Sequence, residues 1–112
     1  MNKTYLLDYV SLDMIHTFPF HMTINKIDQW YFCSQVNTDI TLVNAIRRKD
    51  SARLIGDMCD TKIKPHRRNI RLKPGDVMLV ISLKHRLPKE YTLDDLAKMI
   101  ESDKISLYEV LV

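Results

Sequence analysis

Alternating and periodic hydrophobic positions divide the 112-residue chain into short strands and helices in mixed order. Apolar residues that alternate or run together predict strands over residues 4–7, 21–27, 41–43, 69–73, 77–83 and 105–112. Apolar residues at helical spacing predict helices over residues 11–18, from 28 onward, over 50–58 and from 92 onward. We therefore expect an α/β (α+β) fold, in which a mixed β-sheet of about five strands is flanked by helices. The length predicts a single domain over residues 1–112.

Three of these strands differ in the face they expose. Val77–Ile81 is continuously apolar, which is typical of a central, buried strand. In Asn69–Lys73, apolar and basic residues alternate, so this strand should be half-exposed with its bases outward. His21–Ile27 alternates as an amphipathic strand with Met22 and Ile24 on its apolar face. The expected helix-capping residues are Ser11, Asp28, Asp50 or Ser51, and Thr92.

Charge changes the picture, because the bases are concentrated in one part of the chain. The net charge is +3, but residues 44–89 hold thirteen Lys or Arg and four acids, a net charge of +9, whereas the remainder carries −6. This asymmetry indicates an anionic partner rather than a fold. The bases cluster at expected element boundaries, where loops can converge on a ligand: residues 47–49, 64–68 and 84–89. The first cluster precedes a helix start, whose N–H groups favour anions. A compact phosphate-bearing ligand explains this arrangement, and a solvated cationic surface is the plainer alternative.

Other classes of site find less support. Cys33 and Cys59 match no metal-ligand spacing, and we expect two buried thiols in a protein of the reducing cytoplasm. We expect no metal and no cofactor, since no paired Cys/His motif, Walker loop or dinucleotide fingerprint occurs. No apolar stretch approaches the roughly 18 residues of a membrane span, so no membrane partner is expected. His66 and His85 lie inside the basic clusters and are candidate general acids.

Five segments carry a more specific signal, and the last of them, Lys-Ile-Ser-Leu-Tyr-Glu-Val, is the most distinctive. They are Leu6–Ser11, Asn44–Ile46, Leu54–Thr61, Arg67–Lys73 and Lys104–Val110. Together these segments resemble the viral anti-CRISPR ring nucleases, small homodimers from archaeal viruses, phages and plasmids. The resemblance implies a mixed sheet with flanking helices and a symmetric dimer. It also implies that cyclic tetra-adenylate binds across the two-fold axis in a basic pocket, and that removing this messenger silences host effectors.

The resemblance also marks where this chain departs from the family. The family's loop Asn-Ala-Ile-Gly-His-Asp-Ser aligns so that Arg48 stands in place of the catalytic His, and Asp8 stands in place of an Asn near the ligand. Arg stays protonated and cannot exchange a proton, but it can bind phosphate bidentately. Glu90 is the residue that could replace an acidic group assisting the leaving group. The expected ligand-binding residues are Asp8, Ser11, Arg47, Arg48, Lys49, Ser51, Arg67, Arg68, Lys84 and Arg86.

Three functions follow, from three different classes. A basic pocket without its proton shuttle predicts a sponge that sequesters a cyclic oligonucleotide, either cyclic tetra-adenylate or a cyclic di- or trinucleotide. An active, metal-independent ring nuclease is the first alternative, with His66, His85 or Glu90 transferring the proton. A small DNA-binding regulator is the second. Duplex DNA is disfavoured because the bases lie on expected loops and no helix-turn-helix is recognisable.

Overall fold

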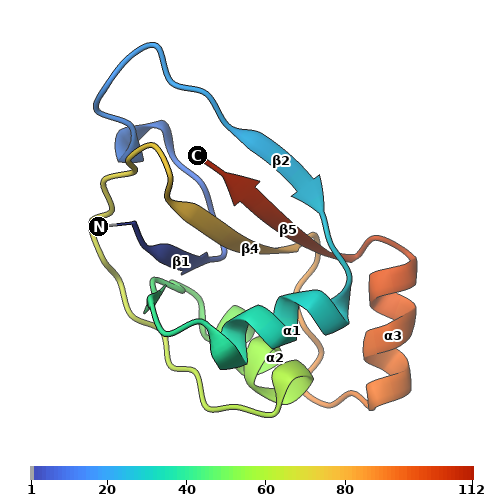
Figure 1. The fold of residues 1–112 in the computed structure, drawn as a ribbon. Helices are drawn as coiled ribbons and strands as arrows, with labels where there is room; N and C mark the ends of the chain where they lie inside the picture. Colours follow the sequence, from blue (N-terminus) through green and yellow to red (C-terminus); the bar gives the residue numbers. More distant parts are fainter. Residues whose placement is uncertain (1) are drawn as a thin grey trace.

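Five strands form one mixed sheet in the computed structural model, which describes residues 2–112 (Figure 1). The strand order is β2-β5-β4-β1-β3. Strands β3, β1 and β4 are parallel neighbours, and β5 runs antiparallel between β4 and β2. The strands are β1 Thr4–Leu7, β2 Thr23–Lys26, β3 Leu42–Asn44, β4 Val77–Leu83 and β5 Ile105–Leu111. The expected α/β class and five-stranded mixed sheet are confirmed, and the apolar β4 is central as predicted.

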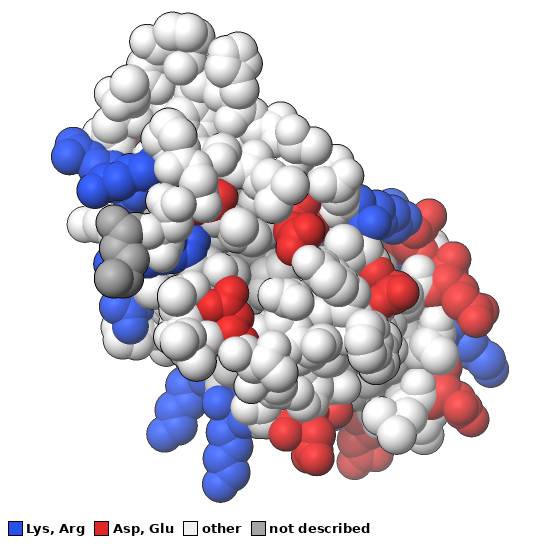
Figure 2. Space-filling model, viewed as in Figure 1, with Lys and Arg blue, Asp and Glu red and all other residues white. Residues whose placement is uncertain are grey.

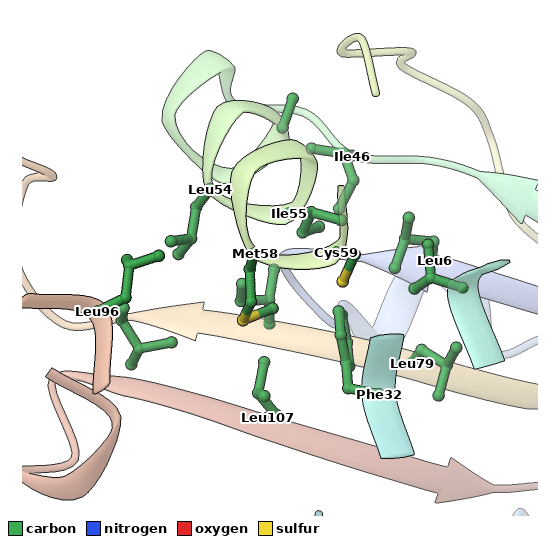
Figure 3. Packing of buried hydrophobic residues seen from close by; sticks show 14 of the residues in the cluster. Leu6, Phe32, Ile46, Leu54, Ile55, Met58, Cys59, Leu79, Leu96 and Leu107 are labelled. Atoms are coloured by element: carbon green, nitrogen blue, oxygen red, sulfur yellow. The ribbon is translucent and has the colours of Figure 1, made fainter. Parts of the chain in front are cut away.

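Three α-helices pack on one face of the sheet: α1 Gln29–Thr38, α2 Lys49–Cys59 and α3 Leu93–Glu101 (Figure 1). Phe32 of α1 and Leu54 and Ile55 of α2 are fully buried against this face. Figure 3 shows these side chains meeting Leu79 of β4 and Leu107 of β5. This cluster is the larger of two hydrophobic cores, and it fixes α2 firmly over the centre of the sheet.

Irregular chain covers the opposite face of the sheet. A short 3₁₀ helix, η1 Leu12–Met14, and the segment 69–73 bury Met14, Ile70 and Leu72 in a second core. The predicted strand over residues 69–73 is therefore wrong, although Ile70 and Leu72 do point inward. The segment has no strand beside it, and its amide at Leu72 donates instead to the carbonyl of Met14. The predicted helix over 11–18 is likewise reduced to the single turn η1, which Ser11 caps by accepting from Asp13 N.

The N-cap residues predicted from the sequence are found in two of the three α-helices. Asp28 caps α1 by accepting from Tyr31 N, and Thr92 caps α3 in a reciprocal capping box with Asp95, as predicted. Helix α2 is different: its N-cap is Arg48, with no side-chain cap bond. The predicted caps Asp50 and Ser51 are thus wrong, because α2 begins one residue before them.

The edge strand β2 corrects a second expectation. The predicted strand forms, but all four of its residues are exposed, including Ile24 at 62%. Strand β2 is an edge strand paired with β5, and within residues 2–112 no element buries the predicted apolar face with Met22 and Ile24.

A disulfide corrects the expectation of two free thiols. Cys33 of α1 and Cys59 of α2 are bonded, with their Cα atoms 4.9 Å apart. The two helices pack side by side on the sheet, which brings together cysteines 26 residues apart in sequence. The argument from free thiols to a reducing compartment therefore no longer holds.

Candidate anion-binding site

The basic residues gather where the parallel strands end. Strands β1, β3 and β4 run in the same direction, so their carboxyl ends lie at one edge of the sheet. Asp8 follows β1, Arg47 and Arg48 come soon after β3, and Lys84 directly follows β4. In open α/β sheets, the crevice outside these strand ends is where ligands bind. The fold thus brings three loops, far apart in sequence, to one place.

A hollow at this edge, here called the Arg86 hollow, has a cavity volume of about 320 Å³. It is lined by Arg48, Asp50, Leu83, Lys84, His85 and Arg86. Two arginines and one lysine therefore share the lining with one carboxylate, and all three basic side chains are exposed. Guanidinium groups can bind phosphate oxygens bidentately, so this lining suits a phosphate group.

The loop that carries Arg47 and Arg48 is held by its main chain. The Asp8 carboxylate accepts the N–H of Arg47 through Oδ1 and the N–H of Arg48 through Oδ2, both at 3.0 Å. Asp8 therefore does not simply repel an anion at this position. The two amides that Asp8 binds immediately precede α2, so they are not available to a ligand anion.

A second hollow, here called the Tyr9 hollow, has a cavity volume of about 430 Å³. Buried Met14 and Ile70 contribute apolar surface to it, and the Arg47 guanidinium carbon lies 4.2 Å from the centre of the Tyr9 ring. The remaining lining residues are Ser11, Asp13, His16, Arg68 and Asn69. Apolar surface, a stacked ring and polar groups are features that bind a nucleobase.

Hydrogen bonds tie the second basic cluster to the β3–α2 loop. Arg68 Nε donates to the carbonyl of Asn44 at 2.8 Å, and the amide of His66 donates to the carbonyl of Ile46 at 2.7 Å. Of the pair Arg67 and Arg68, Arg68 lines a hollow, whereas Arg67 lines neither.

Several predicted site residues lie elsewhere. Ser51 is 2% exposed and cannot contact a ligand in this arrangement, which corrects its assignment. Lys49, His66 and Glu90 are exposed but line neither hollow. Of the three candidate proton-transfer residues, the structure brings His85 alone into the Arg86 hollow with Arg48.

Other parts of the molecule offer weaker candidates. A larger cavity of about 720 Å³ lies between α1 and α2, but Asp28 is the single charged residue in its lining. Among residues 2–112, no group of His, Cys, Asp and Glu is placed to hold a metal ion. No helix within this range is long and apolar enough to cross a membrane.

In the view of Figure 2, acidic side chains lie across the helical face, and Lys and Arg lie towards its margins.

Sequence reasoning missed several residues that the fold adds to the site. Tyr9, His16 and Asn69 line the Tyr9 hollow, and Arg53 contacts the loop after β4. Of these, Tyr9 and Asn69 lay inside segments singled out in the sequence, Leu6–Ser11 and Arg67–Lys73. The other residues are brought to the site by tertiary packing between distant segments, which no local sequence pattern indicates.

Comparisons with known proteins agree with this architecture. A family model described as STIV B116-like matches residues 4–106. The ORF116 protein of Acidianus filamentous virus 1 (isolate United States/Yellowstone) is 32% identical over 107 residues, covering 94% of this chain and 91% of that protein. The solved structure of B116 of Sulfolobus turreted icosahedral virus is 31% identical, with a TM-score of 0.89, and the match covers 99% of this chain and 100% of that one.

Proposed function

The chain belongs to the STIV B116-like family, together with proteins of archaeal viruses, and on this premise we propose that it binds and sequesters a cyclic oligonucleotide second messenger. In this proposal the protein acts in the cytoplasm of the host cell, as an anti-CRISPR protein of the ring nuclease type. It withholds the messenger from host effectors that depend on cyclic nucleotides. The ligand is cyclic tetra-adenylate or a smaller cyclic nucleotide.

One observation carries the proposal: Arg48, Lys84 and Arg86 line a single hollow although they come from two different loops. These three exposed cations outnumber Asp50, the one carboxylate of the lining, so the hollow carries a net positive charge that attracts an anion. A phosphodiester bound there would accept charge-assisted hydrogen bonds, each contributing about 1.5–3 kcal/mol. The Tyr9 hollow, lined by Arg47 next to Arg48 in the chain, supports a nucleotide over a simple phosphate, because its apolar and aromatic surface suits a base.

The same lining favours binding over cleavage. Arg48 stands where the resembling enzymes have a catalytic His, and a guanidinium cannot act as an acid–base catalyst at physiological pH. Loss of a general acid or base usually lowers the rate by about 10²–10⁴. We therefore expect ligand release to outpace chemistry.

A ring nuclease remains the second candidate, because His85 lies in the same hollow as Arg48 and Arg86. An imidazole there could protonate a leaving oxygen beside cations that stabilise the phosphate. A DNA-binding regulator is less well supported, since these bases lie on loops around hollows and not along one exposed helix face.

We also propose that two copies of the chain share the site. Five exposed large apolar side chains fall within residues 10–24, and others lie at Trp30, Ile40, Leu93 and Leu111: the five are Val10, Leu12, Phe18, Met22 and Ile24. A symmetric interface would bury part of this surface and place two sets of basic hollows around one ligand. Light scattering at micromolar concentration should give a dimer, and a monomer with and without ligand would rule out a shared site.

The test of function is incubation with cyclic tetra-adenylate, cyclic tri-adenylate and cyclic dinucleotides, followed by calorimetry and chromatography of the recovered ligand. Sequestration predicts saturable binding of one of these compounds and its recovery intact after the protein is denatured. Linear product formed over many turnovers would identify an enzyme instead. Tight binding of duplex DNA with no binding of the cyclic compounds would support the regulator.

A further inference from the structure

One face of α2 is turned toward the loop 84–92, which connects β4 to α3. Asp50, Arg53 and Asp57 recur at intervals of three and four residues, so they share this face. Asp50 lines the Arg86 hollow, whereas Arg53 and Asp57 bond to the loop itself. The helix that begins directly after Arg48 therefore also contacts the loop that carries Arg86.

The contacts of Arg53 are specific. Its Nη1 donates to the carbonyl of Lys89 at 3.0 Å, and its Nη2 donates to the carbonyl of Pro88 at 2.5 Å. Its guanidinium carbon also lies 5.3 Å from the centre of the Tyr91 ring, in cation–π range. The Tyr91 hydroxyl in turn donates to the Asp57 carboxylate. Arg53 and Asp57 of α2 thus hold residues 88–91 through three hydrogen bonds.

The contacts between α2 and this loop involve partly buried polar groups. Burial, followed by the hydrogen bond to the Asp57 carboxylate, raises the pKa of Tyr91 to about 12, so the hydroxyl remains a donor throughout the physiological range. The Nε of Arg53 is buried and has no hydrogen-bond partner among residues 2–112. Leaving a buried donor unsatisfied is unfavourable.

Arg86 lies between two positions at which hydrogen bonds or burial anchor the loop. On one side, the amide of Lys84 donates to the carbonyl of Lys104, which continues the β4–β5 ladder. On the other, Leu87 is buried and the Arg53 contacts begin at Pro88. Without the Arg53 contacts, repulsion between Arg86 and the other cations of the hollow would favour movement of the loop away from α2.

We infer that Arg53 and Tyr91 are positioning residues, which hold Arg86 against Arg48 so that the cations of the hollow are arranged before an anion arrives. The inference rests on the proposed function for its consequence in binding. Arg53 needs no contact with the ligand, since it acts through the loop carbonyls. Holding a site in its bound arrangement improves affinity because less ordering remains to be done on binding.

The binding test is a double-mutant cycle between Arg53 and Arg86, with cyclic tetra-adenylate and inorganic tripolyphosphate as probes in calorimetry. Arg53→Met keeps much of the side-chain stem and removes both donors, and we expect it to weaken binding roughly tenfold. In an Arg86→Ala background the same change should matter less than twofold, because the residue being positioned is gone. Lys98→Met, which removes one positive charge from α3, is the control and should bind as wild type does.

Arg53→Lys separates geometry from charge. Lysine keeps the positive charge but lacks the planar fork that donates to two carbonyls together. We therefore expect Arg53→Lys to bind nearly as weakly as Arg53→Met. Tyr91→Phe, which keeps the ring under the guanidinium and loses the bond to Asp57, should fall between them and wild type.

A measurement on the free protein tests the inference even if the proposed function fails. Backbone ¹⁵N order parameters of residues 85–87, 89 and 90 should be close to those of a rigid backbone in wild type, and should fall below about 0.6 in Arg53→Met. If neither probe binds wild type, the proposed function is wrong, and these order parameters alone decide the inference. Unchanged order parameters, or an equal loss of affinity in both backgrounds of the cycle, would overturn it.

Discussion

The disulfide between α1 and α2 allows a quantitative prediction about stability. Its two cysteines are 26 residues apart, and closing a loop of that length removes about 12 cal/mol/K of entropy from the unfolded chain in the chain-entropy model. Reduction should therefore lower the free energy of unfolding by about 3.5 kcal/mol at 25 °C. For a domain with a total stability of about 5–15 kcal/mol, this is a substantial fraction.

Urea unfolding with and without a phosphine reductant measures this difference. With a slope of about 2 kcal/mol per molar urea, the midpoint should fall by roughly 1.5–2 M on reduction. Protein concentration must be the same in both arms, since dimer formation would also shift the midpoint. The double variant Cys33→Ala/Cys59→Ala should unfold near the reduced wild type and should not respond to the reductant.

Two results would refute this reasoning. Two titratable thiols in the protein purified without reductant would show that the bond does not form. Coincident midpoints for oxidised and fully reduced protein would show that the bond does not restrict the unfolded chain as the 26-residue separation requires.

Further expectations concern the site and the loops. Arg86→Ala should weaken binding of cyclic tetra-adenylate by roughly ten- to hundredfold in calorimetry, whereas Lys98→Ala should not change it. Arg48→His should increase the cleavage of bound ligand followed by chromatography, if the loop accepts the His in a productive position. Gly75→Ala should destabilise the protein in urea by about 1 kcal/mol or more, because Gly75 has φ +93° and an added Cβ would lie 2.3 Å from Asn2 Nδ2. The pKa of Tyr91 is raised to about 12 from 10.0, so its stabilising effect is complete below pH 10 and is lost as pH rises toward 12; Tyr91→Phe should reduce this alkaline loss in unfolding experiments.

The sequence predicted those elements whose stability is local. Asp28 and Thr92 cap their helices through bonds within three residues, and the apolar run of β4 is buried in the sheet centre. Alternation in residues 69–73 correctly gave the sides of Ile70 and Leu72, but not the backbone conformation, because a strand also needs a neighbour to pair with.

Features that depend on distant parts of the chain could not be predicted in this way. Nothing near Cys33 indicates that Cys59 lies beside it, and nothing near Asp8 indicates that its carboxylate binds amides some 40 positions later. The basic clusters were recognised from composition alone. Which bases share a hollow was decided by the parallel arrangement of β1, β3 and β4, which separates Arg48 and Arg86 from Arg67.

The bonds from Asp8 to the amides of Arg47 and Arg48 have a consequence for how such a protein can evolve. The peptide groups of this loop are anchored, but the side chains at positions 47 and 48 take no part in the anchoring. The residue at position 48 can therefore be exchanged at little expense to the fold, so a histidine or an arginine can be presented there from the same backbone. Under the proposed function, a lineage could in this way move between destroying a ligand and storing it through a change at one position, while its core stays the same.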